Sequence, residues 1–479
     1  MSSDFKTELW EIWLVYFLYT VFIACLVQLV ILPYILPQLH YGQGLMKNCD
    51  WTSFHSQAVE MSNKIKAEGW SALVLRSDYE HQSISGILSV VYALTIQKPW
   101  AFIPVNAFLH ASSEVLLILI MEILTGSRKK AFLSSLPFMF FPSSALWYAQ
   151  IHKDGFFIAG TYLHFYGFLL LIPIIYKKIT LKNIFAGLAC VYLGAFLVWL
   201  IRPYGIQIML AVTGIVAAII LAIFITVKTC NRKIPWIRFG KLIICFFVIS
   251  YILYSFASGG NFFAKPLQKQ TNYAGRQNQD KANTPVSEMA MINSNLNSLE
   301  TEYFQSSMCL GERIRKIINT KLAFLNQIRY GSATSGGKTL LDADIKFNNF
   351  GEYVKYLPRH LQIIFLAPFP NMWFEQGSEN TSGLMRFFSA IEMSITYFFL
   401  LFFPFAVWQL RKKIEAWVLL VMAGGTLLFY GYSIVNIGTL YRFRYGFIAI
   451  FISCGLFGFI QFVELLRNKG LRKFLSAHN

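Results

Sequence analysis

An aspartate near the N-terminus is the first candidate for chemistry. Asp50 lies in the polar stretch after the first hydrophobic run, directly before Trp51. A carboxylate beside aromatic side chains near a membrane surface can have a raised pKa and act as a base, or it can bind a cation. The segment 51–68 has a helical pattern, so the alternative is that Asp50 caps a helix. The residue types leave both interpretations open.

A second acidic candidate, Asp154, forms a charged triplet with His152 and Lys153 between two hydrophobic runs. Charged residues at such a boundary commonly anchor a helix among lipid headgroups. The functional interpretation is that Lys153 binds an anionic phosphate, while Asp154 pairs with a basic group or a hydroxyl.

Three arginines complete the set of candidate binding residues. Arg202 ends a hydrophobic run, and Arg442 and Arg444 open the last one. Single arginines at such places would anchor in headgroups, but these come from distant parts of the chain and fall on one predicted face. The planar guanidinium suits phosphate oxygens. Together with Lys153, the arginines therefore predict a phosphate or pyrophosphate clamp.

Other polar residues give weaker signals. Glu114 lies inside a hydrophobic run with His110 one turn before it, and an ionisable residue at membrane depth suggests function. A structural hydrogen bond between helices is the alternative. Asp342-Ala343-Asp344 resembles a metal-binding pair, but three residues in a polar loop are a weak signal.

The elements that must position these residues are membrane helices. The chain has 479 residues, of which 56% are hydrophobic and only 14% are charged, against about 25% charged in soluble domains. Apolar runs near 20 residues recur, the length that crosses a bilayer. We predict an all-α polytopic membrane protein with about ten spans, over residues 12–36, 101–124, 131–150, 154–176, 182–201, 205–227, 240–257, 384–408, 414–434 and 443–466.

The basic residues predict the orientation of these spans. The net charge is +18, and lysines and arginines without acidic neighbours fill every second connector and the tail, at 128–130, 177–182, 228–241, 411–413 and 467–473. By the positive-inside rule these segments and both termini are cytoplasmic. Topology thus explains the excess charge, and we expect no nucleic-acid partner.

Three parts follow from this arrangement. Residues 1–257 form an N-terminal membrane module whose first outer loop spans 37–100. Residues 258–383 form a large polar outer loop with an interfacial segment at 351–367, and 384–479 add the last helices and a cytoplasmic tail. The apolar stretch 84–97 is too short to cross, so we predict a shallow or re-entrant helix there.

The layout resembles the GT-C glycosyltransferases, which take sugars from polyprenyl-phosphate carriers. In that superfamily the first outer loop carries an acidic residue that acts as base or metal ligand, and Asp50 occupies that position. The segments 51–68 and 84–97 would be the interfacial helices, and Lys153-Asp154 resembles the second acidic site. Asn436–Tyr445 and Tyr356–Arg359 resemble stretches of bacterial membrane proteins associated with surface-polysaccharide synthesis.

The resemblance implies a membrane glycosyltransferase on the outer face of a bacterial inner membrane. Its partners would be a polyprenyl-phosphate-linked sugar, a glycan, lipid or protein acceptor, and membrane lipid. Asp50 and Asp154 would be catalytic, and the substrate-binding set would be Lys153, Arg202, Arg442, Arg444, His55, Asp78 and Glu80. No cofactor is certain, and a divalent metal stays open because the second acid of the first loop, Asp78 or Glu80, has no fixed spacing. A transporter of lipid-linked glycans and a non-catalytic membrane subunit are the alternatives.

Overall fold

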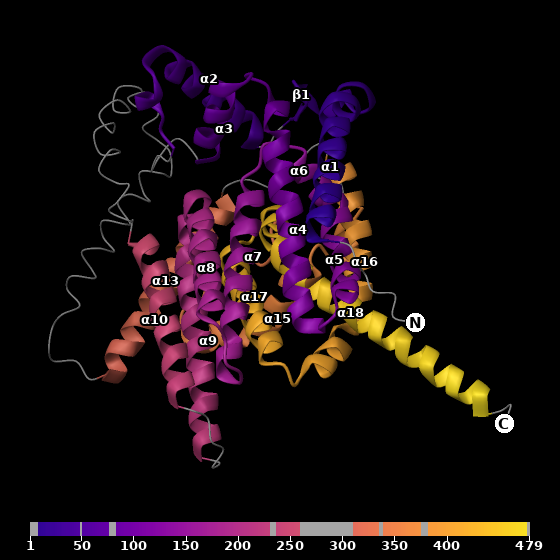
Figure 1. Ribbon diagram of the computed structural model, residues 1–479. Helices are drawn as coiled ribbons and strands as arrows, with labels where there is room; N and C mark the ends of the chain where they lie inside the picture. The colour runs from indigo at the N-terminus through magenta and orange to yellow at the C-terminus, as the bar shows by residue number, and fades with distance from the viewer. Residues whose placement is uncertain are drawn as a thin grey trace.

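The protein is an almost entirely helical bundle. The structure, a computed structural model, describes residues 8–47, 50–75, 83–229, 236–258, 310–334, 339–374 and 382–476. Figure 1 shows long helices side by side, with the first loop covering one end of the bundle. The described helices in the N-terminal half are α1 (Leu9–Leu26), α2 (Asp50–Glu68), α3 (Ser83–Leu94), α4 (Ile103–Thr125), α5 (Arg128–Phe140), α6 (Pro142–Tyr148), α7 (Asp154–Leu171), α8 (Leu181–Ile201), α9 (Pro203–Thr229) and α10 (Trp236–Ala257).

The second half adds two groups of helices. Those before the last membrane helices are α13 (Leu310–Thr334), α14 (Phe350–Lys355) and α15 (Leu357–Leu366), followed by α16 (Ser382–Leu410), α17 (Ile414–Ser433) and α18 (Ile437–Ser476). The strands β1 (His40–Gly42) and β2 (Leu45–Met46) form a two-stranded antiparallel sheet in the first loop. A π-helix, Val27–Ile35, continues α1 toward that loop.

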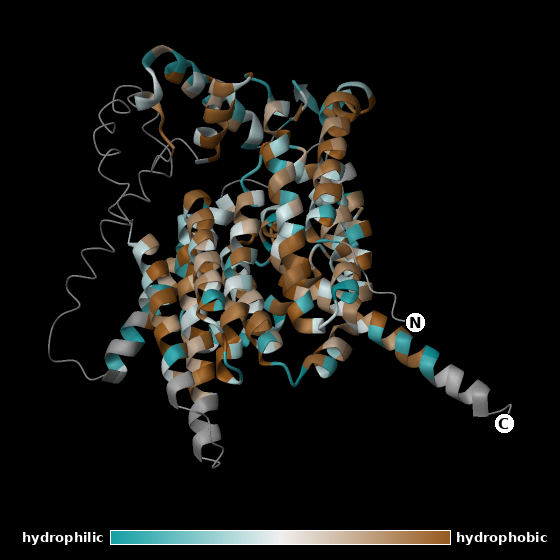
Figure 2. Ribbon diagram, in the orientation of Figure 1, coloured by the Kyte–Doolittle hydropathy of each residue, from teal (hydrophilic) through white to brown (hydrophobic). Residues whose placement is uncertain are grey.

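Nine helices of the described residues are long and apolar enough to span a membrane. The chain is therefore a multi-pass membrane protein, as the sequence predicted. Hydrophobic residues cover the flanks of the bundle, while α2 is more hydrophilic (Figure 2). The short apolar helix α3 has 12 residues, which is too few to cross.

The span expected over 131–150 is divided in the structure. Helix α5 ends at Phe140, and Pro142 begins α6, with Phe141 between them in an extended conformation. Proline has no backbone N–H and disfavours helical geometry in the residue before it, which explains the break. This segment therefore consists of two short helices that meet inside the bundle.

The segment 351–367, for which the sequence predicts an interfacial position, packs one face into the bundle. Its helix α15 buries His360, Ile363 and Ile364, and both His360 and Ile364 lie where a side chain on Gly431 of α17 would stand. The glycine thus lets α15 approach the backbone of α17 closely. The apolar face of α15 is used for protein packing.

The basic connectors meet at one end of the bundle, which we call the basic end. Lys413, in the turn before α17, donates to the carbonyl of Leu124 at 2.6 Å, and Lys130 lies 2.6 Å from Glu464 of α18. These contacts join the α4–α5, α16–α17 and tail segments. The α4–α5 and α16–α17 connectors and α18 thus meet at one physical end, opposite α2 and α3 (Figure 1).

Candidate functional site

The candidate site lies at the other end of the bundle, which we call the site end, and it is centred on Asp154. Asp154 is the first residue of α7 and is 3% exposed. Arg202 follows the last residue of α8, and its Nη2 donates to Asp154 Oδ1. Pro203 directly after Arg202 begins the next helix, so the chain reverses at this arginine. The Arg202 side chain is 1% exposed. Because a buried charge needs a partner of opposite charge, the ion pair with Asp154 keeps the guanidinium in place.

Arg442 connects Asp154 to the first loop. Its Nε is 3.3 Å from Asp154 Oδ2, and its Nη1 donates to Asp50 Oδ2 at 3.2 Å. The two carboxylates differ in access, because the Asp50 side chain is 53% exposed and that of Asp154 is 5% exposed. One guanidinium thus joins an exposed and a buried carboxylate that are 104 positions apart in the chain.

His152 supports Asp154 from inside the turn. Its Nδ1 lies 2.8 Å from Asp154 Oδ2, and its ring lies between the indoles of Trp51 and Trp147, with centroids 6.1 and 6.4 Å away. Burial lowers the pKa of His152, although the Asp154 charge acts in the opposite direction. The imidazole therefore adds no positive charge to the site at neutral pH.

Lys153 adds the third cation. Its Nζ lies 5.7 Å from the centre of the Phe54 ring of α2. Burial, together with the charges of Arg202 and Arg442, lowers the pKa of the Lys153 ammonium to about 8, against the attraction of Asp154 and Asp50. Lys153 thus interacts electrostatically with each of these charged groups. Its ammonium loses a proton more readily than that of an exposed lysine.

The structure separates Arg444 from this cluster. Arg444 is buried and donates to the carbonyls of Ile364 at 2.8 Å and Ile363 at 3.2 Å, and to that of Ala367. These contacts attach the end of α15 to α18. The guanidinium of Arg444 therefore satisfies backbone carbonyls, where the sequence predicted a phosphate contact.

His55 of α2 has a partner outside the charged cluster. Its Nδ1 is 2.7 Å from the hydroxyl of Tyr92, a contact between α2 and α3, and burial together with Lys98 lowers its pKa. The two remaining predicted residues, Asp78 and Glu80, lie outside the described residues.

The weaker candidates have structural partners or lie elsewhere. Asp342 Oδ2 accepts from Tyr356 at 2.8 Å and from Arg359 at 3.0 Å, and although burial raises it, these hydrogen bonds hold the pKa of Asp342 below its ordinary value. Within the described part of the chain, no group of three or more His, Cys, Asp or Glu could hold a metal ion. His110 contacts the hydroxyls of Thr20 and Ser144 inside the bundle.

Aromatic residues that sequence reasoning did not select surround the cations. The Arg202 guanidinium lies 3.8 Å from the centre of the Phe443 ring and 4.7 Å from that of Phe157. Tyr430 of α17 and Tyr204 of α9 have rings 6.4 Å apart beside them. The position of Phe443 between two arginines in the sequence could have indicated that it lies near the site. Nothing in the local sequence distinguishes Tyr430 from other aromatic residues of the spans.

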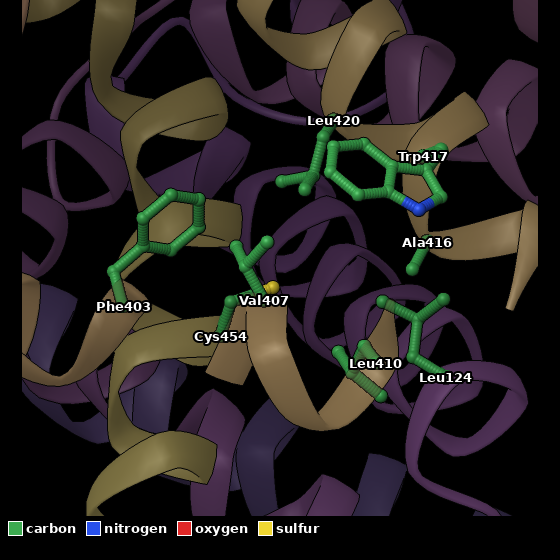
Figure 3. A pocket seen from close by; sticks show the side chains of 8 residues that line it. All are labelled: Leu124, Phe403, Val407, Leu410, Ala416, Trp417, Leu420 and Cys454. Carbon is green, nitrogen blue, oxygen red and sulfur yellow. The ribbon is translucent and has the colours of Figure 1, made fainter. Parts of the chain in front are cut away.

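A separate apolar pocket lies near the basic end, between α4, α16, α17 and α18. Figure 3 shows side chains that line it, which are Leu124, Phe403, Val407, Leu410, Ala416, Trp417, Leu420 and Cys454. The thiol of Cys454 is the only titratable group among these eight side chains. The pocket therefore has no part in the charged site at the other end.

Known proteins do not decide the function of this arrangement. No family model, curated protein or solved structure matches the chain. The geometry itself gives three cations and two carboxylates, assembled from the first loop and from α7, the α8–α9 turn and α18. Such a set can bind an anion and move a proton beside it.

Proposed function

We propose that this protein is a GT-C-like membrane glycosyltransferase. It would transfer a sugar from a polyprenyl-phosphate-type carrier to a glycan, lipid or protein acceptor, on the outer face of a bacterial inner membrane. The observation that carries the proposal is the contact of Arg442 with both Asp50 and Asp154, with Lys153 and Arg202 beside them. The basic end would be cytoplasmic, with both termini, because lysines and arginines are retained on that side.

In this mechanism the donor phosphate lies against Arg442, Lys153 and Arg202. Asp50, the exposed carboxylate, accepts the proton of the acceptor hydroxyl, and the hydroxyl oxygen bonds to the anomeric carbon of the sugar. The bond from that carbon to the phosphate oxygen breaks, and its electron pair leaves with the polyprenyl phosphate. The cations stabilise the charge that develops on the departing phosphate, and the polyprenyl chain stays in lipid.

Arg442 would also control when Asp50 acts. In the structure the Asp50 carboxylate accepts a hydrogen bond from this arginine and is therefore not free to contact an acceptor hydroxyl with that oxygen. A phosphate that binds Arg442 competes with Asp50 for the guanidinium, so Asp50 is released when the donor is in place. Asp154 stays in position because Arg202 and His152 hold it as well.

This mechanism predicts opposite effects of Asp50→Asn on transfer and on binding. Transfer should fall at least a hundredfold because the base is lost. Binding of farnesyl phosphate, a short soluble analogue of the carrier, should become several-fold tighter because Arg442 loses its competing partner. Transfer would be measured by mass analysis of lipid-linked and surface glycans in a deletion strain that carries each variant, and binding by calorimetry in lipid nanodiscs.

The matched control is Glu60→Gln, which removes another exposed carboxylate of the same helix, one that forms an ion pair with Lys64 at 2.7 Å. It should leave both measurements unchanged. Full transfer by the Asp50→Asn variant would remove Asp50 from the mechanism.

One observation favours a second candidate function, transport of a lipid-linked glycan. Discontinuous helices and buried acids inside the membrane are typical of transporters. Here the α5–α6 break places Ser143 against Glu392 of α16, which is 1% exposed, and Glu114 is buried in α4. In the deletion strain, precursor accumulating on the inner leaflet would support transport, whereas accumulation on the outer leaflet would support transfer.

A further inference from the structure

Donors of Arg202 and Tyr430 beside the ion pairs have no hydrogen-bond acceptor in the part of the chain that the structure describes. Arg202 uses Nη2 for Asp154, but its Nε and Nη1 are buried without a hydrogen-bond partner among the described residues. The hydroxyl of Tyr430 is also buried without a hydrogen-bond partner among these residues, and Tyr430 is 3% exposed. Buried donors are normally paired, so unpaired donors gathered at one place point to a ligand.

Arg202 Nε, Arg202 Nη1 and Tyr430 Oη lie among the same aromatic side chains. The Tyr430 ring lies 5.9 Å from Phe157 and 5.5 Å from Phe443, the two rings against which the Arg202 guanidinium lies. The Tyr430 hydroxyl is also 3.3 Å from the place that a side chain on Gly205 would take, and the Gly205 backbone N–H donates to the Arg202 carbonyl at 2.8 Å. Arg202 and Tyr430 therefore approach one another over the α8–α9 turn.

We propose that Tyr430 Oη and Arg202 Nε and Nη1 form a subsite for an oxygen of a phosphate group. The inference rests on the proposed function and adds to it a substrate-binding residue, Tyr430, that neither the sequence nor the ion pairs identified.

Phosphate fits this subsite better than a neutral group. A phosphate oxygen accepts several hydrogen bonds at once, and bonds from donors to an anion are stronger than bonds between neutral groups. The rings of Phe157 and Phe443 exclude water, which increases the strength of these bonds. Asp154 occupies only Nη2 of Arg202, so the guanidinium would be shared between the carboxylate and the phosphate.

The phosphate would arrive beside Tyr204. This residue is the second of α9, its side chain is 47% exposed, and its ring lies 6.4 Å from that of Tyr430. A lipid chain attached to the phosphate would then leave the protein along α9. The subsite thus suits a phosphate carried by a lipid more than free phosphate.

The test compares Tyr430→Phe with Tyr432→Phe in the full-length protein. The first variant removes the unpaired hydroxyl and keeps the ring. The second removes a hydroxyl that donates to the Tyr353 carbonyl at 3.0 Å, on the same helix but away from Arg202. Calorimetry in phosphatidylcholine nanodiscs would measure the affinity for farnesyl phosphate, for inorganic phosphate and for dioleoyl phosphatidic acid, and thermal unfolding would check the fold of each variant.

We expect Tyr430→Phe to weaken farnesyl phosphate binding about tenfold, as loss of one hydrogen bond to a charged group does, and Tyr432→Phe to leave it unchanged. Equal binding by the Tyr430→Phe and wild-type proteins would overturn the subsite while leaving the proposed function in place. Absence of binding of all three phosphates by the wild-type protein would overturn both. Tyr430-dependent binding of phosphatidic acid alone would confirm the phosphate subsite and assign it to a membrane phospholipid.

Discussion

At the scale of single residues, position along a helix separates two arginines that look equivalent in the sequence. Arg442 and Arg444 are two residues apart in α18, which begins at Ile437. An α-helix turns by about 100° per residue, so their side chains point about 200° apart. Arg442 therefore reaches Asp50 and Asp154, while Arg444 reaches the end of α15. Of the three arginines that the sequence selected, the structure thus brings two, Arg202 and Arg442, to Asp154.

Also at this scale, the pKa of Lys153 makes anion binding depend on pH. The pKa lies near 8, below the ordinary value of 10.5, so the ammonium is charged at pH 7 and mostly neutral at pH 9.5. Farnesyl phosphate is doubly charged throughout that range. Its affinity should therefore fall several-fold as the pH rises from 7 to 9.5, as calorimetry would show. A bound phosphate favours the ammonium, so the midpoint should lie somewhat above 8.

The control is Lys153→Arg, because a guanidinium keeps its charge over the same range. Its affinity should show little change with pH. An equally steep decline in this variant would mean that another group titrates and that Lys153 does not contact the phosphate.

At the scale of elements, close packing of α7 against α8 sets the distance between Asp154 and Arg202. Gly160 and Gly167 of α7 face Gly194 and Gly187 of α8, so that a side chain on any of them would collide with the opposite helix. Small residues permit this close approach between membrane helices. The two helices bring their site-end residues together because nothing larger than hydrogen stands between their backbones.

This packing predicts that Gly194→Val destabilises the protein. An added Cβ would stand 2.5 Å from the Gly160 carbonyl oxygen and 2.7 Å from the His164 backbone nitrogen. Backbone atoms cannot move aside without a large cost in free energy. Overpacking of this kind costs about 1–3 kcal/mol. Thermal unfolding in detergent should show a lower Tm, together with weaker farnesyl phosphate binding.

The matched substitution is Gly214→Val, where an added side chain meets open space. It places the same β-branched residue in another membrane helix and should change the Tm much less. Equal losses in the two variants would attribute the effect to valine itself and not to the contact between α7 and α8.

At the scale of the whole molecule, the basic connectors and the candidate site lie at opposite ends of the bundle. The basic connectors before α5 and before α17 lie together at the basic end, and Asp50, Asp154, Arg202 and Arg442 meet at the site end. The separation matches a membrane enzyme or transporter whose polar site faces one compartment.

Cysteine labelling tests this arrangement directly. In a background without Cys49, Cys230 and Cys309, Lys64→Cys on α2 and Lys412→Cys before α17 would each add one exposed thiol. Because basic connectors stay on the cytoplasmic side, an impermeant maleimide should label position 64 in intact cells and position 412 only after permeabilisation. Labelling of both positions in intact cells would contradict the predicted topology.

The sequence by itself determined the membrane class, most of the spans and the alternation of basic connectors. These properties are local, since about 20 apolar residues cross a bilayer whatever their neighbours do. The charged residues Asp50, Lys153, Asp154, Arg202 and Arg442 were also identified, because charges at the ends of apolar runs stand out. The break between α5 and α6 was missed although Pro142 marks it, because the hydropathy of the run continues through the proline.

Only the tertiary structure decided which of these charges meet. In the tertiary structure Arg442 contacts both Asp50 and Asp154. Arg444 donates to backbone carbonyls, and α15 packs one face against the bundle. The tertiary structure also placed Tyr430, an ordinary aromatic residue in the sequence, beside the buried guanidinium of Arg202. Such contacts depend on helix rotation and on the close approach of helices distant in sequence, and neither quantity is present in the hydropathy of any single segment.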